Sequence, residues 1–279
     1  MIFNALTIAG SDSGGGAGIQ ADLKTFSALG VFGVSVVTAL TAQNTHKVRS
    51  IFEAPPEFVA AQIAAVLEDI EVAATKIGML SRVEVIETVA AGIDEFGLEN
   101  VVLDPVMVAK SGDKLLADEA ISAIESVLMP LVSLVTPNLP EASALTGLAV
   151  ARNEDEMLKV AEKLLSLGAR GVLLKGGHLE GAECSDLLHD GEQAQWLRSP
   201  RVHTRNTHGT GCTLSSAITA GLAKGFALSP AVGMAKQYLN GAIVKADELR
   251  VGSGHGPVHH FYRAWPVKDD EEASDVRFE

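Results

Sequence analysis

Short apolar runs alternate with amphipathic patterns along most of the chain, and this alternation constrains the fold more than any other feature. The runs are rich in β-branched residues and cover residues 6–9, 35–40, 101–103, 131–135 and 172–174. Between them, apolar side chains recur at helical spacing, as in Val59, Ile63, Val66 and Ile70 after Pro56. The sequence therefore predicts an α/β fold with a mainly parallel central sheet and helices on both faces. Ligands are expected at the carboxyl ends of the strands.

The organisation of the chain favours one domain. There is no internal repeat, low-complexity tract or Pro/Gly/Ser linker, so we expect a single domain over residues 1–265. Residues 184–203 alternate apolar and polar side chains around a His189-Asp190-Gly191 turn, which predicts a hairpin after the fifth strand. Asn153 is the expected N-cap of a later helix, with Glu156 at the capping-box position. Residues 266–279 are predicted to form an acidic, flexible tail.

Charge and cysteine usage exclude several classes of protein. The 22 Lys and Arg residues against 35 Asp and Glu give a net charge of −13, which makes nucleic acid and anionic membranes poor partners. No apolar run approaches the roughly 18 to 20 residues that span a bilayer, and the N-terminus lacks the basic region of a signal peptide. The two cysteines, Cys184 and Cys212, form neither a disulfide framework nor a zinc pattern. A soluble, cytoplasmic protein is expected.

A glycine-rich loop follows the first predicted strand, between Gly10 and Phe26. Gly16, Gly18 and Ala21 match the GxGxxA pattern of dinucleotide-binding proteins, but residues 36–44 contain no acid to hold a ribose. A tight turn with close helix packing is the structural alternative. The GxxxxGK[ST] motif of P-loop nucleotide sites does not occur in the sequence.

A second loop places Gly209, Thr210, Gly211 and Cys212 at the start of a predicted helix. Free N–H groups and the helix dipole at such a start bind anions, worth up to about 2 kcal/mol for a well-placed charge. The same field is expected to lower the pKa of Cys212 and make it a base or nucleophile. Cys184, inside a predicted strand, is expected to be an inert core residue.

Oxygen-bearing side chains and a lysine follow other strands. Asp104, Asn138 and Glu141 are hard ligands that suit magnesium, although Asn138 and Glu141 also have the spacing of a helix capping box. Lys175 stands between a buried strand and two glycines, where an unpaired ammonium is costly, so a bound phosphate is its expected partner.

The eight histidines give weaker indications. His255, His259 and His260 accompany no carboxylate or cysteine pattern and are interpreted as loop residues. His208 lies beside the second loop and is a further candidate to assist there.

Seven segments occur in an order that resembles a known family: AGSDSGGGAGIQADLKT, TAQNT, KIGML, VLDPVMVAKSG, TPNLPEA, LLKGGH and NTHGTGCTLSSA. Together they resemble the hydroxymethylpyrimidine/phosphomethylpyrimidine kinases of thiamin biosynthesis, in the ribokinase-like superfamily, over roughly residues 5–262. The resemblance implies ATP-dependent phosphorylation of 4-amino-5-hydroxymethyl-2-methylpyrimidine, then of its monophosphate, in one site with Mg²⁺. A helix N-terminus, a lysine and a metal are also what phosphoryl transfer needs.

The resemblance also implies roles for particular residues. Gly209, Thr210 and Gly211 form an anion hole with Cys212, which acts as the base, and Lys175 contacts the transferring phosphate. Magnesium is organised by Asn138, Glu141 and Asp104, and ATP contacts come from Lys175, Asn138, Thr207 and Lys236. The pyrimidine edge is contacted by Gln43 and Asp22, with Gly10, Met79 and Val106 around the ring. Most sugar kinases of the superfamily carry an aspartate in place of Cys212, whereas the pyrimidine kinases and one pyridoxal kinase branch share the cysteine.

Other functions stay open at this stage. A pyridoxal or pyridoxine kinase, or an enzyme with both activities, shares the scaffold and a similar substrate. A nicotinamide-dependent oxidoreductase and a non-catalytic pyrimidine-binding protein are alternatives from other classes. A homodimer is a further expectation, and residues 109–114 are the candidate lid over the phosphates.

Overall fold

The computed structural model describes residues 2–107 and 118–265. The candidate lid at residues 109–114 and the acidic tail at residues 266–279 lie outside this range. None of the helices in the described residues is long and apolar enough to cross a membrane.

One sheet of nine strands forms the centre of the described chain, in the order β3-β2-β1-β4-β5-β6-β7-β8-β9. The strands from β2 to β7 in this order are parallel, and β3, β8 and β9 are antiparallel additions at the two edges. The strands are β1 (Asn4–Asp12), β2 (Phe32–Gln43), β3 (Val48–Glu53), β4 (Ala74–Ile77), β5 (Val101–Leu103), β6 (Leu134–Val135), β7 (Val172–Leu174), β8 (Glu183–His189) and β9 (Ala194–Pro200). The predicted mainly parallel α/β sheet is confirmed.

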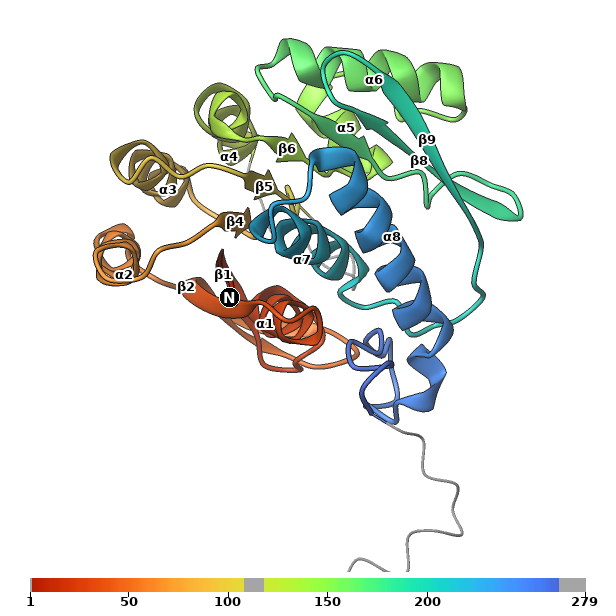
Figure 1. The fold of residues 1–279 in the computed structure, drawn as a ribbon, viewed down its shortest axis with the longest axis horizontal. Helices are drawn as coiled ribbons and strands as arrows, with labels where there is room; N and C mark the ends of the chain where they lie inside the picture. Colours follow the sequence, from red (N-terminus) through yellow and green to blue (C-terminus); the bar gives the residue numbers. More distant parts are fainter. Residues whose placement is uncertain (1, 108–117, 266–279) are drawn as a thin grey trace, which may run out of the picture.

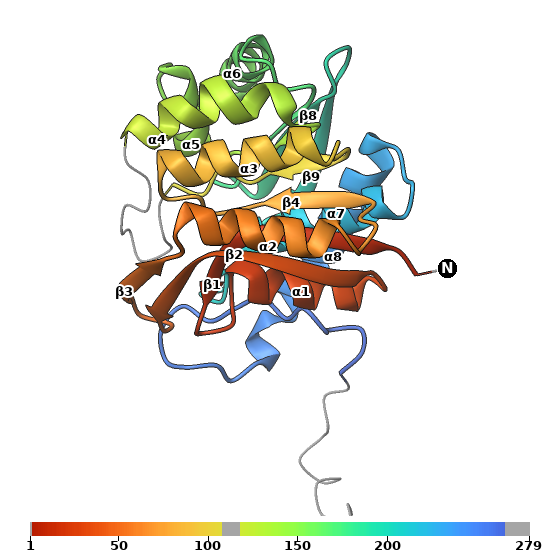
Figure 2. The same ribbon diagram turned by 90° about the vertical axis from the view of Figure 1, so that its left-hand side faces the viewer.

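Helices cover both faces of this sheet (Figures 1 and 2). The helices are α1 (Gly18–Ala28), α2 (Pro56–Leu67), α3 (Val83–Glu95), α4 (Asp118–Ala123), α5 (Leu139–Thr146), α6 (Glu154–Ser166), α7 (Thr210–Ala223) and α8 (Leu228–Val244). α2 to α6 pack on one face and α1, α7 and α8 on the other. Successive strand residues point to opposite faces of the sheet. Leu6 and Ile8 pack in the core on the side of α2 to α6, and Ala5 packs in the core on the side of α1, α7 and α8. Two apolar cores therefore enclose the sheet.

All five predicted strands are present, as β1, β2, β5, β6 and β7, and the sheet contains two further strands, β3 and β4, that the sequence did not predict. β5 and β7 have the predicted bounds, whereas β6 is shorter because Met129–Leu131, which contains Pro130, forms a 3₁₀ turn. β3 is exposed along most of its length, and β4 carries Lys76 inside a run of only four residues.

Local signals at helix ends and in the hairpin also hold. α2 begins at Pro56, and its Val59 and Ile63 are buried as expected. The Asn153 side chain accepts a hydrogen bond from the Glu156 backbone N–H at 2.9 Å and caps α6. β8 and β9 form the predicted hairpin, which extends the sheet beyond β7.

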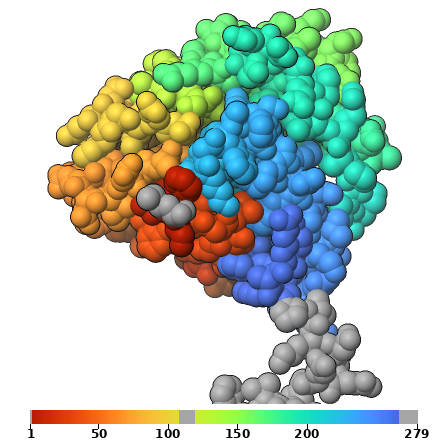
Figure 3. Space-filling view, in the orientation of Figure 1, coloured from red at the N-terminus to blue at the C-terminus, as the bar shows by residue number. Residues whose placement is uncertain are grey.

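The segment after α8 returns to the N-terminal half of the molecule. In Figure 3 the last described residues, in dark blue, lie against the red and orange N-terminal part. The His255 backbone N–H donates to the Thr45 carbonyl at 2.8 Å, which ties this segment to the turn between β2 and β3. Segments from both ends of the chain thus meet beside the carboxyl ends of β1 and β2.

Candidate active site

An open cavity of about 1610 Å³ lies at the carboxyl ends of the parallel strands. Because these ends meet at one edge of the sheet, residues far apart in sequence converge there. The predicted site residues that line it are Gly10, Gln43, Met79, Asp104, Val106, Asn138, Glu141, Lys175, Thr207, Gly209, Thr210, Gly211, Cys212 and Lys236.

The loop before α7 packs tightly on the first glycine loop. Gly209 is the N-cap of α7 with φ +77°, and a Cβ there would lie 1.8 Å from the Gly16 carbonyl oxygen. Gly18 has φ +55°, and a Cβ there would lie 2.2 Å from the Gly10 carbonyl oxygen. This close packing of backbone on backbone supports the tight-turn alternative over a dinucleotide site for the first loop.

The start of α7 presents backbone N–H groups to the cavity edge. Thr210, Gly211 and Cys212 occupy the first turn, whose N–H groups have no partner within the helix, and the Thr210 N–H donates to the Thr207 carbonyl at 3.3 Å. A Cβ at Gly211 would lie 3.3 Å from Lys175 Nζ and 3.4 Å from an Asp104 carboxylate oxygen. The helix N-terminus and the lysine therefore face the same small volume, as anion binding requires.

The expected lowering of the Cys212 pKa is wrong. Burial raises the pKa of the Cys212 thiol to about 11, although the Lys76 ammonium opposes this shift. Desolvation penalises a thiolate more than the nearby positive charge favours it. Cys212 is consequently a thiol at neutral pH, and its sulfur accepts a hydrogen bond from the Gly18 backbone.

The structure does not bring the Asp22 side chain to the cavity, in contrast to the expectation from the sequence. Asp22 is fully buried, and its carboxylate accepts four hydrogen bonds: from Thr7 Oγ1 at 2.7 Å, Ser216 Oγ at 2.7 Å, and Lys76 Nζ at 2.8 and 3.0 Å. These four hydrogen bonds, from three donor groups, occupy the acceptor sites of the carboxylate. Asp22 therefore holds Lys76 instead of contacting a ligand.

Lys76 is the site residue that the sequence analysis missed. It projects from β4, is fully buried and lines the cavity. Burial disfavours its charge, but Asp22 and then Cys212 outweigh burial and raise the pKa of Lys76. Ser216, which binds Asp22, lies one helical turn after Cys212, so the Asp22–Lys76 pair sits beneath the first turn of α7. The signal in the sequence was a single charged residue, the lysine, within the otherwise uncharged segment Ala74–Ile77.

Lys175 contacts two carboxylates beside the first turn of α7. Its Nζ lies 3.0 Å from Asp104 Oδ1 and 3.9 Å from Glu141 Oε2. Burial opposes the charge of Lys175, but these acids raise its pKa to about 12. Burial raises the pKa of Glu141 to about 7, with Lys175 opposing the shift.

Asn138 and Glu141 also form the capping box that was their structural alternative. Asn138 Oδ1 accepts from the Glu141 backbone N–H at 2.9 Å, and Glu141 Oε2 accepts from the Asn138 backbone N–H at 2.7 Å. The cap fixes both side chains at the start of α5. No group of three or more His, Cys, Asp or Glu side chains in the described ranges could hold a metal by itself.

Lys236 and Thr207 lie at the side of the cavity formed by α8 and the loop before α7. Lys236 Nζ bonds to Asp186 of β8, whose other oxygen accepts from the Gly176 backbone N–H at 2.9 Å. The Thr207 carbonyl accepts from Thr210 Oγ1 at 2.6 Å. Lys236 is thus positioned by a contact to β8, and Thr207 by a contact to the first residue of α7.

The histidines divide as follows. His259 and His260 lie in irregular structure as expected, but they are buried, and burial lowers the pKa of His260 to about 3. His255 is exposed. His208 lines the cavity and contacts both Asp12 and Gln43.

Comparison with known proteins agrees with this geometry. A family described as phosphomethylpyrimidine kinase matches residues 12–259. A hydroxymethylpyrimidine/phosphomethylpyrimidine kinase of Rhizobium meliloti is 57% identical over 94% of this chain and 98% of its own length. Among solved structures, an ADP complex of Bacillus subtilis pyridoxal kinase is 41% identical with a TM-score of 0.88, covering 95% of this chain and 100% of that one. A phosphomethylpyrimidine kinase from Clostridium difficile is 45% identical with a TM-score of 0.77, covering 86% and 99%.

Proposed function

This chain belongs to the phosphomethylpyrimidine kinase family, and from that premise we propose that it phosphorylates 4-amino-5-hydroxymethyl-2-methylpyrimidine with ATP. The monophosphate is then phosphorylated to the diphosphate in the same cavity, as a step of thiamin biosynthesis. The observation that carries the proposal is the convergence of the α7 N-terminus, Lys175 and Cys212 on one cavity that is also lined by Gln43.

The phosphoryl group is proposed to lie against the start of α7. Backbone N–H groups of Gly211 and Cys212 donate to its oxygens, and the Lys175 ammonium neutralises charge that develops there. Asp104 holds Lys175 at 3.0 Å, so the ammonium is positioned before a nucleotide arrives. Little energy is then spent on reorganisation during transfer.

Cys212 is proposed to accept the proton of the attacking hydroxymethyl group. With a pKa of about 11, only about one thiol in a thousand is ionised at pH 8, so the base is weakly populated at rest. Lys76 is the cation that opposes the effect of burial on this thiol. We therefore assign Lys76 the role of stabilising the thiolate, with Asp22 holding it in place.

The nucleotide and the pyrimidine are proposed to occupy different parts of the cavity. Val202, Leu239 and Ile243 offer an apolar wall beside Lys236 that suits a flat purine base. Gln43 meets the polar edge of the pyrimidine. The ring itself is surrounded by Gly10, Met79 and Val106.

Magnesium fits the acidic pair beside Lys175. Asp104 and Glu141 share a single ammonium, which leaves one negative charge in excess when both are ionised. Mg²⁺ is commonly held by one or two carboxylates together with water and substrate phosphates. When bound, the ion would supply positive charge to the β- and γ-phosphates, with Asn138 at the same strand end.

The test is a coupled kinase assay with three acceptors: the aminopyrimidine, its monophosphate and pyridoxine. The proposal expects turnover of the first two. Turnover of pyridoxine alone would establish the alternative, a pyridoxal-type kinase, which the 41% identity to the Bacillus subtilis pyridoxal kinase supports. Turnover of all three would indicate dual specificity, and ATP binding with no phosphorylated acceptor would refute a kinase acting on these rings.

A homodimer is proposed through the β2–β3 edge. Leu40 and Phe52 face each other across these strands and are 52% and 69% exposed. An exposed apolar pair on the last two strands of a sheet favours association with a second copy. Light scattering that shows a monomer at micromolar concentration, or a dimer unaffected by Phe52→Ser, would contradict this interface.

We propose the cytoplasm as the location of the protein. The two free thiols are compatible with that reducing compartment.

A further inference from the structure

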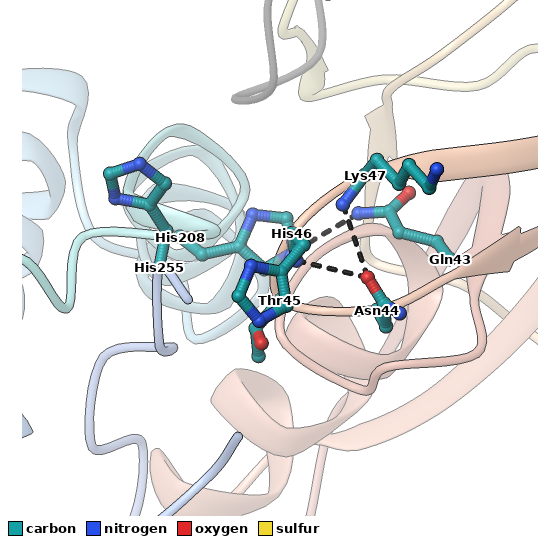
Figure 4. A pocket seen from close by; sticks show the side chains of 7 residues that line it. All are labelled: Gln43, Asn44, Thr45, His46, Lys47, His208 and His255. Carbon is teal, nitrogen blue, oxygen red and sulfur yellow. Dashed lines mark hydrogen bonds between the residues drawn. The ribbon is translucent and has the colours of Figure 1, made fainter. Parts of the chain in front are cut away.

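Asp12, Gln43 and His208 meet at the edge of the cavity although they are far apart in sequence. Asp12 ends β1, Gln43 ends β2, and His208 directly precedes the α7 N-cap. His208 Nε2 lies 2.9 Å from Asp12 Oδ2 and 3.2 Å from the end of the Gln43 side-chain amide. Figure 4 draws the contact between the His208 ring and Gln43 as a dashed line.

The His208 ring is held in one place. A Cβ at Gly16 would lie 2.5 Å from ring Cδ2, so the ring rests directly on the glycine loop. The His208 backbone N–H donates to the Gly256 carbonyl at 3.0 Å, and the side chain is 12% exposed. The ring nitrogen facing Gln43 therefore has little freedom to turn away.

Asp12 determines that His208 Nε2 carries a hydrogen. Burial of the Asp12 carboxylate opposes its negative charge. Hydrogen bonds from His208 and from the backbone N–H groups of Gly14 and Ala17 nevertheless keep the pKa of Asp12 below its usual value. An ionised carboxylate only accepts hydrogen bonds, so Nε2 donates to Asp12. The same N–H is then directed partly at Gln43.

The hydrogen bonds around Gln43 fix how its amide is turned. With the amide nitrogen toward His208, as drawn in Figure 4, two N–H groups would face each other. At its other end the amide lies 3.4 Å from Thr41 Oγ1, whose one hydrogen is already donated to the Ser11 carbonyl at 3.0 Å. Turning the amide by 180° resolves both conflicts, because Oε1 then accepts from His208 and Nε2 donates to Thr41.

We propose that His208 is a positioning residue that locks the Gln43 amide in this orientation and thereby selects the ring edge that the cavity accepts. The inference rests on the proposed function only in taking Gln43 as the residue that meets the ring. The locked amide presents its donor and acceptor in one fixed order. A 4-aminopyrimidine has a donor amine beside an acceptor ring nitrogen. It therefore matches the Gln43 amide in one orientation and not in the orientation turned by 180°.

The experiment compares two ligands with opposite patterns. The aminopyrimidine carries a donor beside an acceptor, and its 4-oxo analogue, as the lactam, carries an acceptor beside a donor. Dissociation constants for both are measured by calorimetry on wild type, on His208→Leu, which lacks the N–H, and on His208→Gln, which keeps a donor. His208→Ala carries the same expectation as His208→Leu and does not depend on packing against Gly16.

His208→Leu is expected to reduce the preference for the amino ring by about tenfold. Without the His208 N–H, the Gln43 amide can turn by 180° and form hydrogen bonds to the 4-oxo ring as well. His208→Gln should retain most of the preference. In a Gln43→Ala background, His208→Leu should leave the ratio of the two constants unchanged. A preference unaltered in His208→Leu and His208→Ala, equal weakening of both ligands, or an effect that persists without Gln43 would each overturn the inference.

Phosphoryl transfer is measured separately on the wild type. A protein that shows the expected binding preference without transferring phosphate would refute the proposed function and leave this inference standing.

Discussion

Replacing Lys76 with methionine removes the charge of the ion pair beneath Cys212 while keeping most of the side-chain volume. Both partners of this pair are fully buried, with Nζ 2.8 Å from Asp22 Oδ2. In the variant, Asp22 keeps its hydrogen bonds from Thr7 and Ser216 but loses its counter-charge. An uncompensated carboxylate then remains in the interior of the protein.

The expected loss of stability in Lys76→Met is large. Removing one partner of a buried ion pair typically costs about 3 to 5 kcal/mol of unfolding free energy. The two hydroxyl donors that remain on Asp22 place the expectation near the lower end, about 3 kcal/mol. For a chain of this size that corresponds to a melting temperature lower by roughly 6 to 12 °C. Turnover at neutral pH should fall as well, because Lys76 is the cation that opposes the raised pKa of Cys212.

Urea unfolding followed by far-ultraviolet circular dichroism measures this cost in four proteins: wild type, Lys76→Met, Asp22→Asn and the double variant. The double variant should be less destabilised than the sum of the single variants, since it leaves no charge unpaired. Lys159→Met on the exposed side of α6 is the matched control and should change stability by less than about 0.5 kcal/mol. If Lys76→Met resembles this control, or if the two substitutions are simply additive, the reasoning about the buried pair is refuted.

Three further outcomes are expected. Cys212→Ala should retain ATP affinity, because the backbone donors survive, and lose about 100-fold to 10,000-fold in turnover; near-normal turnover would remove Cys212 from the role of base. Lys175→Met should lower stability, because it leaves the buried Asp104 carboxylate without its cation, and should also lower the turnover of the protein that remains folded; a folded variant with normal turnover would show that this lysine is only structural. Because Glu141 has a pKa of about 7 and a divalent cation favours its ionised form, Mg²⁺ affinity should rise with pH through that region in wild type and not in Glu141→Gln; identical pH profiles would exclude Glu141 from the metal site.

Much of the fold follows from local patterns. The runs at β5 and β7 are continuous and apolar because both faces of these strands are covered by helices, and such runs are visible without knowledge of their partners. Pro56 and Asn153 mark helix starts through their own backbone chemistry. β4 escaped prediction because Lys76 interrupts its apolar pattern, and that lysine is acceptable there only because Asp22 lies opposite it.

In the candidate site, too, features that depend on neighbours in sequence were predictable, and features that depend on other elements were not. The helix start after Gly209 was predictable, since glycines and an amphipathic segment adjoin in sequence. The capping box of Asn138 and Glu141 was predictable as an alternative, and both side chains reach the cavity while forming it. The burial of Asp22 and the raised pKa of Cys212 were not predictable, because each depends on side chains from other elements.

The sequence by itself determined the alternation of strands and helices, the positions of the glycine loops and the family to which the chain belongs. These features depend on neighbours within a few residues or on motif order, so the chain carries them locally. The tertiary structure alone decided that Asp22 binds Lys76, that His208 joins Asp12 to Gln43, and that Lys175 holds two acids. Charge, hydrogen-bond direction and pKa depend on distances of about 3 to 4 Å between segments that only the folded sheet brings together.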